Sequence, residues 1–259
     1  MKKFFSLSLF SLLLCGVQSG VVQAQDKSFT NSIGMEFVLI PAGQSIRAEG
    51  LNDFGEEAEH QVSISQPFYL GKYEVTQEQW VAVMGTGSNP SIFKGRTNPV
   101  ENVSWDDVQV FIQKLNEKEG DNKYRLPTEA EWEHAARAGS ETKWFFGSDP
   151  NQLGKYAWFK DNSAGTTHPV GEKQPNPWGL YDIYGNVWEW VQDWYGEYPE
   201  GAMMDPTGPA SGSARIYRGG SWFNPANSCR SAYRGKRLPG YRRSHLGFRL
   251  AFSSPPRSI

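Results

Sequence analysis

Two carboxylates in the C-terminal half of the sequence stand at a spacing that could bind a metal ion. Asp182 and Glu189 lie seven residues apart, and Gly185 between them can turn the chain so that backbone carbonyls are exposed. Carboxylate and carbonyl oxygens are the hard ligands that Ca²⁺ prefers. The alternative is structural: Asp182 caps a turn, and Glu189 pairs with an arginine.

Thiol and imidazole groups are few. No pair of the four histidines has a metal-ligand spacing, so no histidine metal site is expected. No Gly-rich phosphate loop follows a strand, and no serine elbow is present. The two cysteines are Cys15 and Cys229. For Cys229 a buried, small apolar residue is favoured over a reactive thiol.

The C-terminal third is locally basic although the net charge of the whole chain is only −2. Arginines that stack on aromatic rings and bond loop carbonyls are favoured over a patch for an anionic ligand. The overall charge gives no general attraction to nucleic acid. The basic residues of this third are Arg215, Arg218, Arg230, Arg234, Lys236, Arg237, Arg242, Arg243 and Arg249.

Local signals predict three helices and several short strands. Thr76, Ser104 and Thr128 each precede a helical pattern and act as N-caps. Residues 35–43, 61–65 and 68–75 read as strands, and after Gly139 we expect loops with short strands near 187–194, 216–219 and 247–252. An aromatic content of 14% with 27 glycines indicates a loop-rich α+β domain pinned by buried rings.

The N-terminus reads as a secretory signal. Two lysines precede an apolar run, and cleavage is expected after Ala24, which makes residues 1–24 a signal peptide. A membrane anchor is the first alternative, but the apolar run is shorter than the ~20 residues that span a bilayer. Lipidation at Cys15 is the second. We therefore expect a periplasmic or secreted protein with no transmembrane segment after cleavage.

Several motifs in a fixed order resemble the formylglycine-generating enzyme family, also called sulfatase-modifying factors. They include residues 35–43 (MEFVLIPAG), 125–133 (RLPTEAEWE), 179–190 (GLYDIYGNVWEW), 218–222 (RGGSW) and 246–249 (LGFR). The resemblance implies one irregular α+β domain over residues 35–252, a variant of the C-type lectin fold. It would follow a polar lead-in at 25–34 and precede a loose tail at 253–259.

The resemblance also implies a calcium site. Its ligands would be the side chains of Asp182 and Glu189 and the backbone carbonyls of Gly185 and Val187. The family's second calcium site is not expected here, because Trp158 stands where that site needs an Asn and the loop is shortened. Asp161 and Asn162 then read as turn residues.

The family's catalytic cysteine pair cannot be assembled from this sequence. Counted from Ser221, the first cysteine position is Asn224 and the second is Cys229; counted back from the 246–249 motif, Cys229 matches neither. Copper is not expected, because Cu(I) prefers a pair of thiolates. The family branch that uses a histidine-bound iron is also rejected. The candidate pocket consists of Trp188, Ser221, Trp222, Asn224, Cys229 and Arg230.

Two functions from different classes follow. The first is an exported, formylglycine-generating-enzyme-like protein that modifies or matures a partner peptide or protein in the cell envelope, an oxidoreductase-like activity if it is catalytic. The second is a non-catalytic, calcium-stabilised binding or regulatory module of an envelope assembly, such as a secretion system or a signalling kinase. Its interaction surface would contain the rings of Trp158, Trp178, Trp194, Tyr195 and Tyr198.

Overall fold

The computed structural model describes residues 1, 26–47, 50–52, 55–57 and 60–253. The predicted signal peptide and most of the predicted tail therefore lie outside the described residues. Among the residues described, no helix is long and apolar enough to cross a membrane.

Three α-helices form where the capping residues predict them. They are α1 (Gln77–Met84), α2 (Trp105–Glu119) and α3 (Glu129–Arg137). Each begins with a complete capping box, in which the N-cap side chain accepts the N3 backbone N–H and the N3 side chain accepts the N-cap N–H. The apolar residues Val108, Phe111, Ile112 and Leu115 of α2 are all buried. Helix α3 ends at Arg137, and Ala138 follows it in the left-handed conformation.

Short strands supply the rest of the regular structure. A five-stranded antiparallel sheet has the order β1 (Ser28–Thr30), β2 (Glu36–Ile40), β7 (Phe68–Gly71), β14 (Ala251–Phe252) and β8 (Tyr124–Arg125). A three-stranded sheet has the order β10 (Met203–Met204), β6 (His60–Ile64) and β3 (Gly43–Arg47), and β4 (Gly50–Asn52) pairs with β5 (Gly55–Glu57).

A four-stranded sheet carries the candidate site. Its order is β12 (Arg234–Arg237), β11 (Arg215–Arg218), β9 (Trp188–Trp194) and β13 (Leu246–Gly247). Two 3₁₀ turns, Pro150–Lys155 and Ala226–Ser228, complete the regular structure of the described part. The sequence motifs at 179–190, 218–222 and 246–249 thus meet around one sheet, because β9 pairs with both β11 and β13.

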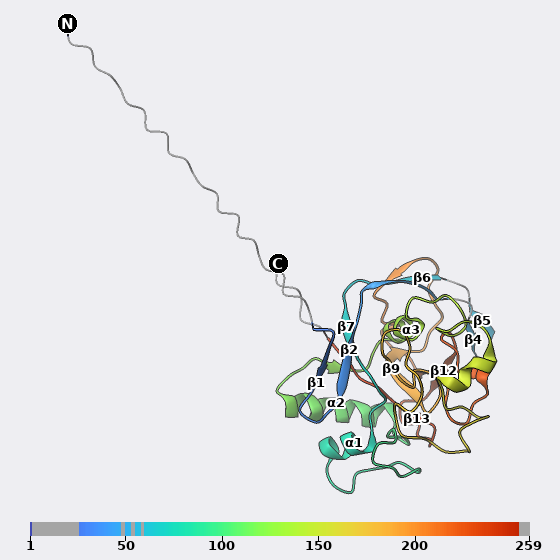
Figure 1. Cartoon of the computed structure of the whole chain (residues 1–259). Helices are drawn as coiled ribbons and strands as arrows, with labels where there is room; N and C mark the ends of the chain where they lie inside the picture. Colours follow the sequence, from blue (N-terminus) through green and yellow to red (C-terminus); the bar gives the residue numbers. More distant parts are fainter. Residues whose placement is uncertain (2–25, 48–49, 53–54, 58–59, 254–259) are drawn as a thin grey trace.

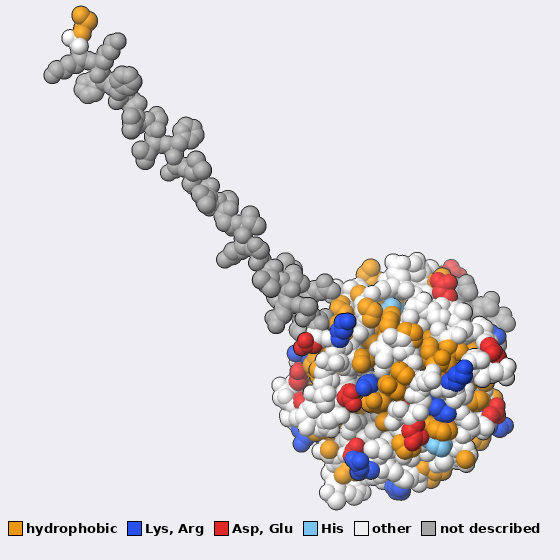
Figure 2. Space-filling model, viewed as in Figure 1, with side chains coloured by type: hydrophobic (Ala, Val, Ile, Leu, Met, Phe, Trp, Pro, Cys, Tyr) orange, Lys and Arg blue, Asp and Glu red, His pale blue; other side chains and the backbone are white. Residues whose placement is uncertain are grey.

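Two apolar clusters form the core of the described residues. One cluster surrounds α3 and includes Trp132 and Trp144; the other surrounds α1 and α2 and includes Trp80, Phe111 and Trp190. Helices α1 and α2 pack together at one end of the molecule, and α3 lies nearer the centre (Figure 1). On the face seen in Figure 2, apolar side chains gather between Lys or Arg and Asp or Glu side chains, and neither sign of charge dominates.

Candidate functional site

Three predicted pocket residues meet in one hydrogen-bonded group. The side-chain oxygen of Asn224 accepts from Trp188 Nε1 at 2.8 Å and from Ser221 Oγ at 2.5 Å. Ser221 and Trp188 are buried, whereas Asn224 is half-buried. The first residue of β9 and the turn that follows β11 therefore hold the Asn224 amide in a fixed orientation near the surface.

Two glycines make the turn possible. Gly219 and Gly220 have φ values of 99° and 80°, which are in the left-handed region that only glycine adopts without strain. A Cβ on Gly220 would lie 2.4 Å from Cys229 Sγ. The Arg-Gly-Gly-Ser run is therefore required both for the backbone turn and for the close approach of the thiol.

Cys229 lies beneath this turn and is fully buried. Burial raises the pKa of its thiol to about 12, although the Ser221 backbone N–H acts in the opposite direction. Its carbonyl accepts a 2.5 Å hydrogen bond from Trp144 Nε1. Burial and the raised pKa favour a protonated, small apolar side chain over a thiolate.

The other two pocket residues lie at the edge of this group. Trp222 is half-buried, donates from Nε1 to the Ser244 carbonyl at 3.0 Å, and contacts the rings of Phe93 and Phe223. Arg230 is 7% exposed and donates from Nε to the Asn227 carbonyl. Desolvation lowers the pKa of Arg230, which shows that its charge is only partly solvated.

The predicted metal carboxylates lie in a second place, together with a third carboxylate that the sequence analysis did not find. Glu74 accepts hydrogen bonds from Asn186 Nδ2 at 2.7 Å and from the Val187 N–H at 3.0 Å. Asp182 and Glu189 are its charged neighbours, and all three are buried around the Arg249 guanidinium. Three carboxylates thus share one arginine, and negative charge is in excess.

We call Glu74, Asp182 and Glu189 the acidic centre. Burial and the neighbouring charges shift the pKa values of Glu74 and Asp182. Burial, followed by the charges of Asp182 and Glu189, raises the pKa of Glu74 well above its usual range. Burial raises the pKa of Asp182 to about 6. Arg249 and the Gly171 N–H oppose the shift at Asp182 by stabilising its charged form.

The two carboxylates among the expected calcium ligands differ in their freedom to bind a cation. Asp182 Oδ2 accepts from the Gly171 N–H at 2.7 Å, while its buried Oδ1 has no hydrogen-bond partner and is free to bind a cation. Glu189 accepts two contacts at each oxygen, three from Arg249 and one from Trp132. These contacts fill the lone pairs of a carboxylate. Glu189 would become a ligand only if Arg249 moved.

The loop at 156–162 is closed by turn contacts. Asn162 Oδ1 accepts from the Phe159 N–H at 2.8 Å, and its Nδ2 donates to the Ala157 carbonyl. Asp161 is exposed. Trp158 stacks on His168 with ring centroids 3.7 Å apart, and its carbonyl accepts from the Asn186 N–H. This loop thus packs against the residues that carry the acidic centre.

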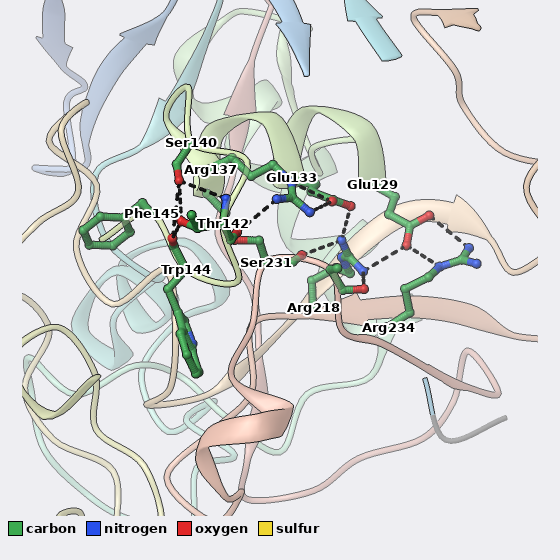
Figure 3. A network of polar contacts seen from close by, with 12 residues as sticks. Glu129, Glu133, Arg137, Ser140, Thr142, Trp144, Phe145, Arg218, Ser231 and Arg234 are labelled. Carbon is green, nitrogen blue, oxygen red and sulfur yellow. Dashed lines mark hydrogen bonds and ion pairs between the residues drawn. The ribbon is translucent and has the colours of Figure 1, made fainter. Parts of the chain in front are cut away.

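Buried ion pairs join helix α3 to the four-stranded sheet (Figure 3). Glu133 pairs with Arg137 at 2.7 Å and with Arg218, while Glu129 pairs with Arg234 at 2.6 Å and lies 3.5 Å from Arg218. All five side chains are at most 3% exposed. Arg218 and Arg234, two of the basic residues expected to be structural, thus lie in buried ion pairs with α3.

The rings expected to form an interaction surface do not form one group. Trp158 packs on His168 and Trp178 on His134, whereas Trp194 and Tyr198 line a cavity of about 320 Å³ near the end of β9. Arg215 lies between the rings of Trp105 and Trp194, at 3.8 and 3.4 Å. All five predicted rings, Trp158, Trp178, Trp194, Tyr195 and Tyr198, are half-buried.

The chain is similar to known proteins in both sequence and structure. The family model described as a sulfatase-modifying factor enzyme 1-like domain matches residues 22–254. The chain belongs to this family. The variable protein 1 of Treponema denticola is 36% identical with a TM-score of 0.80, and PvdO of Pseudomonas aeruginosa is 30% identical with a TM-score of 0.74. Each covers 89% of this chain and is itself covered completely.

Curated relatives match this chain over part of their own length. The chaperone protein LppX of Paenibacillus barcinonensis is 34% identical over 65% of this chain and 74% of its own length. The formylglycine-generating enzyme of Mus musculus is 32% identical over 91% and 65%. The serine/threonine-protein kinase pkn1 of Chlamydia pneumoniae is 32% identical over 95% and 43%. The α+β fold of the formylglycine-generating enzyme type is thus established.

Proposed function

We propose that this protein binds a partner polypeptide at the surface around Asn224 and assists the maturation of that partner without two-cysteine copper chemistry. The observation that carries the proposal is the state of the two candidate cysteine positions. Position 224 holds an amide whose oxygen is bound by Trp188 and Ser221, and Cys229 is buried with a pKa of about 12.

The amide at position 224 and the buried, protonated thiol of Cys229 argue against a thiolate pair for Cu(I). A soft metal of this kind requires deprotonated sulfur ligands, and an amide oxygen does not replace one. Ser221 donates its hydroxyl proton to Asn224, which is not a base, so the serine is not activated as a nucleophile. What remains is a preorganised polar group flanked by aromatic rings, which suits recognition of a polypeptide.

The names of relatives support an assisting function. A relative called a chaperone protein shares 34% identity over 74% of its own length. Under this proposal the signal at residues 1–24 delivers the protein to the periplasm or outside the cell, where it meets its partner. The C-type-lectin variant of the fold, inferred from the family likeness, is part of the same proposal.

Calcium stabilisation is proposed alongside partner binding. The unpartnered Asp182 oxygen and the excess of buried carboxylates over Arg249 support a bound cation. Bound calcium would supply positive charge to this centre. Asp182 would be its side-chain ligand, with the carbonyls of Gly185 and Val187, and Glu189 would join them on release from Arg249.

A second candidate is a non-catalytic regulatory module of an envelope assembly or a signalling kinase. The similarity to the kinase pkn1, of which this chain spans 43%, favours it. Both candidate functions use a binding surface. A maturation factor changes the covalent structure or the folding of its partner, whereas a regulatory module does not. Mass spectrometry and refolding assays of the identified partner would separate them.

The test replaces Asn224 and leaves the scaffold intact. We expect Asn224→Ala to abolish cross-linking of an envelope partner to a photoreactive residue at position 223. The exposed Asn227, in the same loop, gives a matched control, and Asn227→Ala should retain the cross-link. Both variants should keep the circular dichroism spectrum of the parent. Equal cross-linking of the two variants would refute partner binding at this site.

A further inference from the structure

A continuous row of rings runs from the Asn224 site across the surface. Phe93 contacts Trp222 at 5.2 Å between ring centroids, Trp222 contacts Phe223 at 5.6 Å, and Phe223 stacks on His245 at 6.1 Å. Phe223 is 59% exposed. Since Asn224 follows Phe223 directly, a polypeptide bound at the site would also contact this row.

Guanidinium groups border the same row. Arg237 and Arg243 lie 5.4 and 4.9 Å from the centroid of the Tyr241 ring, and both are exposed. The next residue after Arg237 is Leu238, which is 67% exposed. We call Trp222, Phe223, Arg237, Tyr241, Arg243 and His245 the basic-aromatic surface.

The surface is electrically positive. After burial, the charges of Arg243 and Arg237 are the causes that lower the pKa of His245. The sequence contains no Asp or Glu after Asp205, so this part of the chain brings no carboxylate of its own. Asp107 of α2 reaches its border and pairs with Arg242 at 2.7 Å, and β12, which ends at Arg237, contacts β4. In the described part of the chain, no carboxylate lies within ion-pair distance of Arg243.

We propose that the basic-aromatic surface binds an acidic segment of the partner polypeptide that also carries an apolar side chain. This inference rests on the proposed function, because it names the chemical class of the partner at the same site. Arginine forks bind carboxylates with two parallel hydrogen bonds, and the exposed Phe223 and Leu238 give apolar contacts between the charges. The backbone of a duplex nucleic acid would leave these apolar contacts unused, whereas a peptide with acidic and apolar side chains uses both kinds of contact.

The experiment measures binding of two labelled peptides to the mature protein by fluorescence anisotropy. One peptide alternates Glu and Phe, and the other carries Lys in place of each Glu. We expect only the acidic peptide to bind, and its affinity to fall as ionic strength rises. Arg243→Glu should weaken this binding about tenfold, since a charge reversal a few ångströms from a carboxylate changes the interaction by more than the thermal energy.

A matched control reverses an exposed charge elsewhere. Lys114→Glu on α2 makes the same change in net charge and should leave the affinity unchanged. Equal binding of both peptides, or no effect of Arg243→Glu, would overturn the inference. Preferential binding to anionic phospholipid vesicles or to duplex DNA would overturn it in favour of those ligands. If Asn224→Ala abolishes partner cross-linking while Arg243→Glu does not, the proposed function stands and this inference falls.

Discussion

Removing the charge of Glu133 should destabilise the protein strongly. Glu133 accepts from Arg137 Nε at 2.9 Å and NH2 at 2.7 Å, and it also pairs with Arg218. Gln at this position keeps the shape and one acceptor oxygen, but it leaves two buried guanidiniums with less compensating charge. Breaking a buried ion pair by removing one partner costs about 3–5 kcal/mol.

The contacts that remain to the two arginines in Glu133→Gln decide how large the loss of stability is within the range of about 3–5 kcal/mol. Arg218 keeps Glu129 at 3.5 Å and two backbone carbonyls, whereas Arg137 keeps the Thr142 carbonyl at 3.3 Å. Most of the loss should therefore come from Arg137. The double variant Glu133→Gln with Arg137→Met should lose less stability than the sum of the two single variants, because it also removes the unpaired charge.

Urea unfolding followed by tryptophan fluorescence measures this loss in the free energy of unfolding, and thermal unfolding measures the accompanying change in melting temperature. In a domain of this size the melting temperature should fall by about 6–20 °C, at about 2–4 °C per kcal/mol. Glu117→Gln on the exposed face of α2 is the control and should change stability by less than about 0.5 kcal/mol. A loss below about 1 kcal/mol in Glu133→Gln would refute the view that these buried pairs hold α3 to the sheet.

Burial raises the pKa of Glu101 to about 7 in the folded protein, whereas the pKa of an unfolded Glu is about 4.3. The protonated form therefore contributes stability that is complete below about pH 4.3 and is lost as the pH rises through about 7. Urea midpoints between about pH 5 and about pH 8 should therefore fall less in Glu101→Gln than in the parent, and identical slopes would contradict this. Cys229 should resist iodoacetamide in the native protein and react after unfolding in urea, because its thiol is buried and protonated. Rapid alkylation of the folded protein, or tight copper binding lost in Cys229→Ser, would reverse the assignment of its role. Elemental analysis should find calcium bound to the protein, and chelation should lower its melting temperature; Asp182→Asn should weaken both effects, whereas an unchanged melting temperature after chelation would exclude a stabilising metal.

The sequence predicted best those features that depend on a few neighbouring residues. The three helix starts follow from Thr76, Ser104 and Thr128, because a capping box is a contact between residues three apart. The shorter strands β10 and β12 were not predicted. They consist of two and four residues, and their pairing depends on partners far away in the chain.

The acidic centre was predicted only in part for the same reason. Asp182 and Glu189 share one motif, whereas Glu74 reaches them through contacts with Asn186 and Val187, more than a hundred residues later in the chain. Its only local signal was a charged residue between a buried strand and a helix N-cap. The arginine alternative for Glu189 could be stated from the sequence, but the identity of Arg249 as its partner required the fold.

The scaffold and the site are separable because β9 sends consecutive side chains to different environments. Trp188 donates to Asn224 at the surface, Glu189 pairs with the buried Arg249, and Trp190 packs in the core and donates to the Val103 carbonyl. The side chain at position 224 therefore accepts from one indole and one hydroxyl, while the buried ion pairs join α3 to the sheet without it.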